Sequence, residues 1–525
     1  MKTPFELEEK FHAWFDANKI VAFLTAIIAG IITHLSLIAM QLVCADGLMF
    51  SIRYEGSEGE MTIGRWGLAL IGRFWPDREA HAAVVPLCIL YAAVCAILVI
   101  DMLQIKSRFT SFLIGLSFVC APAFTILLYY SFTAAKYCFA MLLSVAAAWI
   151  VWKLKRWYSI PAAAVLLMLS LSIYQGYIGM FTGLAVAITL KHLLNKDEEV
   201  KEKISSLKIF AQFVASAVLG MILYLISLKI MCKMFDLVVT YGNAASFTPS
   251  YIVKNFFSAI GKSYQDFFAY FFADGIVKNT AWHRDDIFAC IGILILINIV
   301  ILLIQNFSKK NWWVVAVAAV LTLLLPVAIN SVDVITMGNG IYQLTAMPLI
   351  LAAIFGLALA EMTDFKFVLK LLPWGEMAFV SLMLTTYIFA SIFSHMYMRM
   401  QYDRITTIAN RAMDRVETTE GYEPGMRIAF FGTPSMELYG LDDSYKEYDL
   451  GDIADFGIFH EGLWAAVYQS WGKVLIKYMG TAYPYADVGT AAAIYGSPEF
   501  QEMECFPDKD SVQIINDVVV VKFSL

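Results

Sequence analysis

Residues 20–73 read IVAFLTAIIAGIITHLSLIAMQLVCADGLMFSIRYEGSEGEMTIGRWGLALIGR, and this stretch decides the architecture. Its first part, residues 20–43, holds no Asp, Glu, Lys or Arg and is long enough to cross the ~30 Å hydrocarbon core of a bilayer as a helix. Residues 44–73 then hold four acidic side chains and three arginines. Charge at that density, directly after an apolar helix, indicates chemistry on an anionic substrate at a membrane surface.

The whole chain has the composition of a polytopic membrane protein. Of its 525 residues, 60% are hydrophobic and 16% are charged, whereas soluble proteins average about 25% charged residues. The formal net charge of -6 argues against nucleic acid as a partner. All cysteines except Cys505 lie in or beside apolar segments, so no disulfide framework is expected.

Eleven apolar segments predict about eleven transmembrane helices. Their approximate limits are 20–44, 83–103, 109–131, 137–152, 158–174, 176–194, 208–231, 286–306, 312–330, 343–360 and 373–394. The connections on one side are short and basic, as at Lys106 and Arg108, and the positive-inside rule makes that side cytoplasmic, together with the N-terminus. The loops 45–82 and 232–285, and everything after about residue 395, are then outside.

This topology predicts an α-helical polytopic membrane protein in three parts. Residues 1–19 are expected to form a cytoplasmic amphipathic helix with an aromatic apolar side. Residues 20–395 form the transmembrane domain, and its aromatic outer loop 232–285 is expected to fold into one or two helices in the membrane interface. Residues 396–525 form a small extracytoplasmic α/β domain.

Several elements of that outer domain can be predicted from local pattern. The last span is expected to continue as a polar helix over residues 395–419. Residues 427–432 have the pattern of a buried strand that ends at glycine and proline. A helix is expected over about 459–479, and two short strands are expected around Asn516 and Asp517.

Asp46 is the strongest candidate for catalysis. A carboxylate at the outer end of a span, next to Gly47, can face a cavity and accept a proton from a substrate hydroxyl within hydrogen-bond reach. The alternative interpretation is an acidic residue that marks the membrane edge. Position alone does not decide between the two.

Arg53, Arg65 and Arg73 are candidates for binding phosphate, because the guanidinium fork matches phosphate oxygens. Arg65 and Arg73 lie in a glycine-spaced run that is expected to form a helix along the interface. Contact with lipid headgroups would explain the same residues without a substrate. Three arginines in an outer loop nevertheless run against the positive-inside rule, and this favours a function.

Further polar residues are candidates for substrate binding. Tyr174 and Gln175 interrupt two apolar runs, and polar groups at membrane depth normally line a cavity or are buried in protein. Contact with a sugar hydroxyl and simple helix–helix packing both fit them. The other candidates are Glu55, His283, Arg284, Tyr342 and Gln343. The HRDD sequence at 283–286 lacks diagnostic ligand geometry, so we expect no metal.

Taken together, these features resemble the GtrII-type glucosyltransferases, bacterial polytopic enzymes of the GT-C class, over about residues 20–395. The resemblance rests on Asp46, on Gly64-Arg65-Trp66 and Gly72-Arg73-Phe74 in the first outer loop, and on Ser172, Tyr174 and Gln175 in an S-x-Y-Q element. Enzymes of this class often carry a pair of acids in that loop. Here the second position is Gly47, so the acid role falls to Asp46, with Glu55, Glu58 or Glu60 as substitutes.

The resemblance implies a hexosyltransferase of the bacterial cytoplasmic membrane that uses no cofactor. Its donor would be a polyprenyl-phosphate sugar such as undecaprenyl-phosphate glucose, and its acceptor a hydroxyl of a surface glycan such as O-antigen. Asp46 would deprotonate that hydroxyl, the arginines would stabilise the departing phosphate, and the anomeric centre would be inverted. A flippase and a polyprenyl-phosphate glucosyl synthase are the partners that it implies.

Two other functions remain open on the sequence. One is a lipid-linked glycan flippase or polymerase, but a transporter is expected to bury charges near the midplane of several spans. Here the charges gather in outer loops. The other is a non-catalytic membrane protein that binds glycans, which would not need Asp46.

Overall fold

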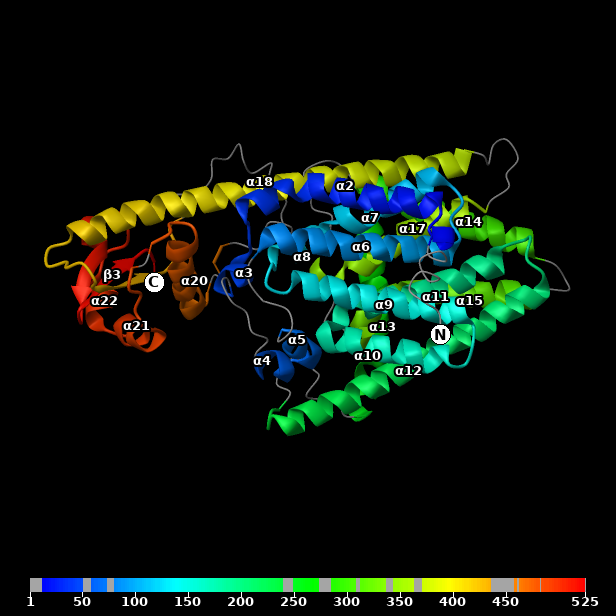
Figure 1. Ribbon diagram of the computed structural model, residues 1–525, viewed down its shortest axis with the longest axis horizontal. Helices are drawn as coiled ribbons and strands as arrows, with labels where there is room; N and C mark the ends of the chain where they lie inside the picture. Colours follow the sequence, from blue (N-terminus) through cyan, green and yellow to red (C-terminus); the bar gives the residue numbers. More distant parts are fainter. Residues whose placement is uncertain are drawn as a thin grey trace.

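The computed structural model describes most of the chain, and Figure 1 shows long helices side by side in one bundle, with a small region at one end that holds the C-terminus. The described residues are 12–50, 58–72, 80–238, 249–272, 285–307, 312–336, 343–362, 371–435, 458–459, 462–481 and 483–524.

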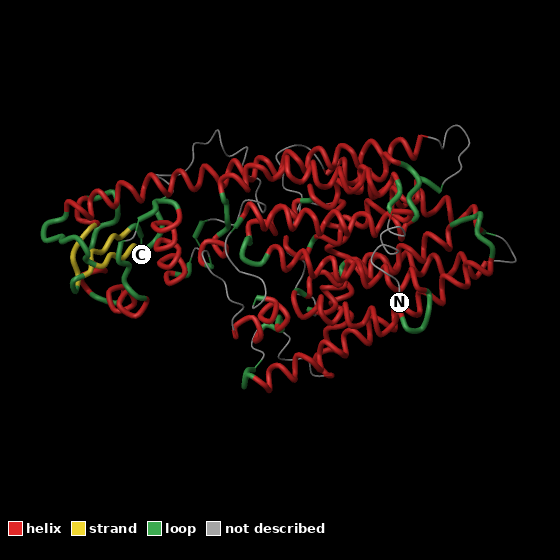
Figure 2. Tube along the Cα trace, in the orientation of Figure 1, coloured by secondary structure: helices red, strands yellow, loops and turns green. Residues whose placement is uncertain are grey.

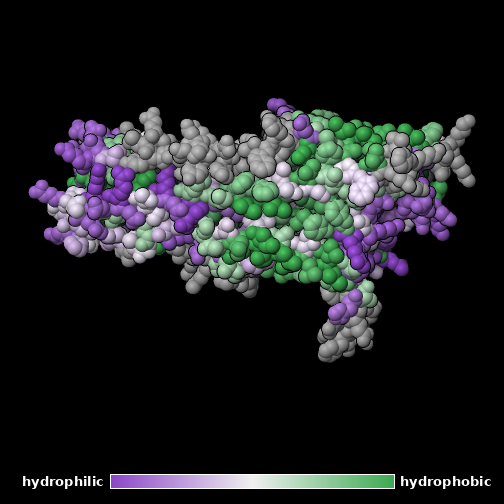
Figure 3. All heavy atoms as spheres, turned by 90° about the horizontal axis from the view of Figure 1, so that it is seen from above, coloured by the Kyte–Doolittle hydropathy of each residue, from purple (hydrophilic) through white to green (hydrophobic). Residues whose placement is uncertain are grey.

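Within these residues, nine helical stretches are long and apolar enough to cross a membrane. They are α2 (Ala17–Met40), α6 (His81–Leu103), α7 with α8 (Arg108–Cys120 and Pro122–Tyr129), α9 (Ala134–Leu154), η1 with α11 (Gln175–Tyr177 and Ile178–Leu194), α12 (Val200–Met234), α14 (Asp285–Asn306), α15 (Trp312–Ile329) and α18 (Leu371–Thr418). Figure 3 shows hydrophobic residues over the bundle and hydrophilic ones gathered at both ends of the molecule, one of which is the C-terminal region. The chain is therefore a helical multi-pass protein, as its composition predicts.

Two of the eleven predicted spans form shorter helices. The first, α10 (Ser159–Ile173), has 15 residues and is about 22 Å long, which is less than the hydrocarbon core requires. The second is α17 (Ile350–Ala360), which follows the 3-10 turn η4 (Met347–Leu349). Nine spans are thus supported by length, and the count of eleven, which needs α10 and α17 to cross as well, stays a prediction.

One end of the bundle collects the short basic connections. The Asp16 side chain caps α2, which begins at Ala17 and so starts earlier than predicted. Asn18 Nδ2 donates to the Lys106 carbonyl at 3.0 Å, and the Lys106 amide donates to Glu361 Oε2 at 2.8 Å. Segments that the sequence assigns to one side of the membrane therefore meet. The predicted helix over residues 1–19 falls mostly outside the described part.

The other end carries short elements between the long helices. They are α3 (Ala45–Met49), α4 (Glu58–Thr62), α5 (Trp66–Ile71), α16 (Ser331–Ile335) and η3 (Gln343–Thr345). Between α12 and α14 the chain also forms a longer helix, α13 (Pro249–Phe272), of 24 residues. Within its described residues, the aromatic loop thus holds one helix, α13, which packs on α14, α15 and α16. A hydrogen bond of 2.6 Å between the hydroxyls of Tyr270 and Tyr387 also ties α13 to α18.

Helix α18 links the bundle to the C-terminal region. It has 48 residues, which makes it about 72 Å long at 1.5 Å per residue. Its first half is apolar, and its second half, after His395, is the polar helix that the sequence predicts over residues 395–419. Figure 1 shows α18 running along the bundle and continuing beside the C-terminal region.

The C-terminal region is built on a three-stranded sheet of order β1-β3-β2, drawn in yellow in Figure 2. Strand β1 (Arg427–Phe431) pairs in parallel with β3 (Val518–Lys522), and β2 (Val512–Ile515) pairs antiparallel with β3. Asn516 and Asp517 join β2 to β3 with φ of 51° and 58°, as a tight hairpin turn requires. The predicted strand, hairpin and helix are all present.

Among the described residues of that region, three α-helices accompany the sheet: α20 (Trp464–Lys477), α21 (Val488–Tyr495) and α22 (Pro498–Glu502). Lys522, at the end of β3, is buried, and its ammonium donates to the carbonyls of Phe500, Gln501 and Met503. A buried charge needs such partners, and these bonds fasten α22 to the sheet. Helix α20 connects this region to the bundle, because it packs against α3.

Candidate functional site

Two of the short sequence elements singled out above meet at the end of the bundle that carries α3, α4 and α5. Gln175 Nε2 donates to the Gly64 carbonyl at 3.3 Å and to Tyr224 Oη at 2.9 Å. Tyr224 Oη in turn donates to the Gly64 carbonyl at 3.1 Å. The break between α10 and α11 is therefore joined directly to the turn that precedes Arg65.

Glycine is required where these elements touch. Gly64 has φ of +84°, and a Cβ there would lie 2.6 Å from Tyr224 Oη. At Gly67 a Cβ would lie 2.1 Å from Ser172 Oγ, and contacts that short demand a residue without a side chain. The left-handed turn at Gly64 also explains why the predicted interface helix starts only at Trp66, as α5, and is separate from α4, which ends at Thr62.

Arg65 is held in a fixed orientation by aromatic and polar groups. Its Nη1 donates to Tyr137 Oη at 2.8 Å and lies 3.6 Å from Glu60 Oε2. The guanidinium carbon is 5.1 Å from the centre of the Tyr174 ring, which is within the range of a cation–π contact. Tyr137 and Tyr174 stack on each other at 4.1 Å. The Arg65 side chain keeps 19% of its surface exposed, so a ligand can reach an oriented cation.

Asp46 lies half-buried in the first turn of α3. The backbone beside it is fixed by Tyr129, whose carbonyl accepts from the Cys44 amide at 3.3 Å. A Cβ at Gly47 would lie 2.6 Å from that same carbonyl oxygen. The glycine next to Asp46 therefore allows α3 to approach α8 closely.

The segment just before α3 is held by α18 and by the C-terminal region. Tyr402 Oη, on α18, donates to the Val43 carbonyl at 2.8 Å. Lys477 Nζ and Tyr478 Oη both donate to the Gln41 carbonyl at 3.2 Å. With α20 packed on α3, these bonds fix the backbone that carries Asp46 from several sides.

A buried chain of polar side chains supports the same place from inside the bundle. His34 Nε2 lies 2.9 Å from the Val119 carbonyl, and His34 Nδ1 lies 3.1 Å from His395 Nε2. His395 Nδ1 lies 2.8 Å from Tyr129 Oη, which also contacts Ser394 Oγ at 2.8 Å. With both imidazoles neutral, one arrangement of donors gives every group a partner. In it the Ser394 hydroxyl donates to Tyr129, Tyr129 donates to His395, His395 donates to His34, and His34 donates to the Val119 carbonyl.

Sequence reasoning missed this chain. The available signal was a histidine inside each of two apolar segments, where polar side chains are costly and usually paired. It also missed Lys136, a buried lysine directly before Tyr137. Asp333 is fully buried in α16. Helix α16 contacts η1, which contains Gln175.

Several predicted site residues lie where the structure gives no side-chain description. Arg53, Glu55, Arg73, His283, Arg284 and Tyr342 are outside the described residues, and of Gln343 only the backbone is described. Gln343 begins η3, which contacts η1. Across the ranges that the structure covers, no group of three His, Cys, Asp or Glu side chains could hold a metal ion.

The described residues thus bring Arg65 against Tyr174 and Gly64 against Gln175, and they place Asp46 at the same end of the bundle, as Figure 1 shows for α3 and α5. A half-buried carboxylate can accept a proton from a hydroxyl. An oriented guanidinium can bind phosphate oxygens in a fixed geometry. These are the two groups that transfer of a sugar from a phosphate-linked donor requires.

Comparison with known proteins identifies the family. A family model described as glucosyl transferase GtrII matches residues 35–353. Neither the curated proteins nor the solved structures contain a match to the chain. The family match covers more than half of the sequence and includes α3, α5 and η1, and membership implies a glucosyltransferase in a membrane. It confirms the resemblance seen in the sequence: this chain belongs to the GtrII glucosyl transferase family.

Proposed function

We propose that the protein transfers glucose from a polyprenyl-phosphate donor to a hydroxyl of a cell-surface glycan, on the outer face of the bacterial cytoplasmic membrane. The observations that carry this proposal are the contacts of Arg65 with the Tyr174 ring and of Gly64 with Gln175, which join the first loop to the break between α10 and α11. These residues lie within the part of the chain that matches the family.

Orientation in the membrane is argued from the basic connections. Asn18, Lys106 and Glu361 meet at one end of the bundle, and the positive-inside rule assigns a lysine- and arginine-rich end to the cytoplasm. Asp46, Arg65 and the C-terminal region would then be extracytoplasmic. A surface glycan is available on that side.

The reaction would proceed as a single displacement. The Asp46 carboxylate takes the proton from the acceptor hydroxyl while the hydroxyl oxygen attacks the anomeric carbon of the glucose. The bond from that carbon to the phosphate oxygen breaks, its electron pair stays on the phosphate, and the polyprenyl phosphate leaves. Attack opposite the leaving group inverts the anomeric centre.

Arg65 would stabilise the charge that builds on the departing phosphate. Its guanidinium is already oriented by Tyr137 and Tyr174, so little reorganisation is needed as the bond breaks. Arg53 and Arg73 are proposed to supply further donors to the phosphate. Glu55, His283, Arg284, Tyr342 and Gln343 are proposed substrate contacts, and a flippase and a polyprenyl-phosphate glucosyl synthase remain proposed partners.

The test is transfer of labelled glucose from undecaprenyl-phosphate glucose to surface glycan by the wild type and by Asp46→Asn. The variant keeps the size of the side chain but lacks the base, and general-base catalysis is worth about 10²–10⁴-fold. We expect a loss in that range. Asp517→Asn is the matched control, because it removes a carboxylate at a position with φ of 58° that asparagine adopts readily. Undiminished transfer by Asp46→Asn would show that Asp46 is not the base.

A further inference from the structure

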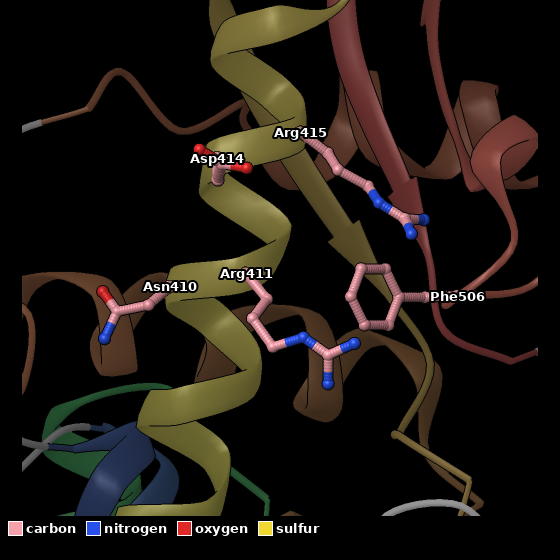
Figure 4. Close-up of a pocket in the computed structure, with 5 residues that line it drawn as sticks. All are labelled: Asn410, Arg411, Asp414, Arg415 and Phe506. Carbon is pink, nitrogen blue, oxygen red and sulfur yellow. The ribbon is translucent and has the colours of Figure 1, made fainter.

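We propose that the C-terminal region binds an anionic group, a phosphate or a carboxylate, of the acceptor glycan in a pocket between α18 and Phe506. The pocket has a volume of about 430 Å³ and is shown in Figure 4. Its lining residues are Asn410, Arg411, Asp414, Arg415 and Phe506. The identity of the ligand as an acceptor glycan rests on the proposed function.

Two arginines give this pocket its chemistry. Arg411 and Arg415 are one helical turn apart on α18, and Figure 4 shows both side chains extending toward Phe506. Their guanidinium carbons lie 5.5 Å and 4.8 Å from the centre of the Phe506 ring. Because both guanidinium groups contact one buried ring, they are held near each other and oriented, as recognition of a planar or tetrahedral anion requires.

The hydrogen bonds of Arg415 leave its charge available. Its Nη1 donates to the Asp508 carbonyl and to Ser511 Oγ, and both of these acceptors are uncharged. The Asp508 carboxylate accepts from the Asp510 amide through Oδ1 at 2.9 Å. Arg415 is therefore anchored without being neutralised by these partners, and its positive charge can act on an anion in the pocket.

The remaining lining residues suit a sugar. Asn410 and Asp414 are exposed beside the two arginines. An amide and a carboxylate can exchange hydrogen bonds with sugar hydroxyls, while the guanidinium groups bind the acidic substituent. The volume lies within the range of known ligand pockets. A sugar unit that carries both hydroxyls and one acidic group fits this set of donors and acceptors.

The position along α18 favours a glycan over a lipid headgroup. Arg411 is 16 residues beyond His395, which is about 24 Å along the helix. His395 is fully buried in the bundle, at the point where the apolar half of α18 ends. The pocket also lies after residue 353, where the family match ends, so it is separate from the residues proposed to bind the donor.

The experiment measures binding to the full-length protein in detergent by calorimetry. The probes are inorganic phosphate, trigalacturonic acid as a carboxylate glycan, and maltotriose as a neutral glycan. We expect at least one of the two anionic probes to bind, maltotriose to show no measurable binding, and Arg411→Gln to weaken the anionic probe about tenfold, since one charge-assisted hydrogen bond is lost. Which anionic probe binds identifies the acidic group.

Arg399→Gln is the matched control, because Arg399 is on the same helix but does not line the pocket, and it bonds Asp403 at 2.9 Å. It should bind the probe as the wild type does. Thermal unfolding of each variant checks that it is folded. Equal binding of the anionic probe by Arg411→Gln and the wild type would overturn the proposal, as would no binding of either anionic probe or equal binding of maltotriose. Displacement of the probe by dioctanoyl phosphatidylglycerol would assign the pocket to a lipid headgroup instead of a glycan.

Asp46→Asn separates this proposal from the proposed function. The variant should lose glucose transfer and keep wild-type binding of the anionic probe. Probe binding together with failed transfer by the wild type would contradict the proposed function and leave the pocket standing. Normal glucose transfer by the wild type without binding of either anionic probe would contradict the pocket and leave the proposed function standing.

Discussion

Replacing Gly67 with alanine tests whether the close approach of α5 to α10 holds the candidate site together. A Cβ at this position would lie 2.1 Å from Ser172 Oγ, 3.0 Å from Ser172 Cβ and 3.1 Å from the Ser172 carbonyl carbon. Rotation of the hydroxyl relieves only the first contact, so the two helices must separate. Overpacking of this kind costs about 1–3 kcal/mol, and 2 kcal/mol changes a folding equilibrium about 30-fold.

The same displacement moves Arg65, which is two residues before Gly67 and contacts the Tyr174 ring beyond Ser172. We therefore expect Gly67→Ala to lower the melting temperature and to reduce glucose transfer to less than about a tenth, because a shift of about 1 Å in a catalytic group can cost 10²-fold in rate. Thermal unfolding of the purified protein and the labelled-glucose assay, at equal amounts of protein, measure the two effects.

A second substitution makes this prediction specific. Ser172→Gly removes both Oγ and Cβ and so relieves the two shortest of these three contacts, while the 3.1 Å contact with the carbonyl carbon stays. The double variant, Gly67→Ala with Ser172→Gly, should regain most of the glucose transfer lost by Gly67→Ala. Its transfer should therefore be close to that of Ser172→Gly alone. That single variant is the control, since glycine within a helix costs about 1 kcal/mol. Wild-type activity and melting temperature for Gly67→Ala, or no recovery in the double variant, would refute the argument.

Two further substitutions test neighbouring contacts. Gln175→Leu removes the donor to the Gly64 carbonyl and to Tyr224. We expect a loss of about 1 kcal/mol of folding stability and reduced glucose transfer. An unchanged melting temperature would contradict this. His395→Phe removes the hydrogen bonds from His395 to the Tyr129 hydroxyl and to the His34 ring, which costs about 1–3 kcal/mol of folding stability. His395→Gln can both donate and accept, so it should be less destabilised. Equal melting temperatures of the two variants would argue against the hydrogen-bonded chain.

The sequence predicts those parts of the fold that depend on local pattern. All eleven apolar segments lie in helices, because a run of apolar residues in a bilayer must satisfy its backbone internally. The turn at Asn516 and Asp517 is predictable because these residues tolerate positive φ. The strand at β1 and the polar extension of α18 follow from patterning in the same way.

Contacts between distant segments could not be predicted in this way. His34 and His395 are 361 positions apart, and nothing in either segment indicates the other. Arg411 and Arg415 have the pattern of a solvated helix face, and only the fold brings Phe506 against them. Even the interface helix predicted around Arg65 starts later than expected, at Trp66, because a left-handed turn at Gly64 precedes it.

These long-range contacts bear on how the C-terminal region participates in the reaction. Tyr402, Lys477 and Tyr478 lie after residue 353, where the family match ends, yet they hold the carbonyls of Val43 and Gln41 just before α3. A segment fixed by three side-chain hydrogen bonds loses little further entropy when a substrate binds. The C-terminal region would then do more than bind an acceptor, since the helix that carries its arginines also positions the backbone of Asp46. One rigid element, α18, would then hold both the glycan, at Arg411 and Arg415, and the base, beside Tyr402. The long polar extension of α18 would serve to keep these two groups at a fixed distance.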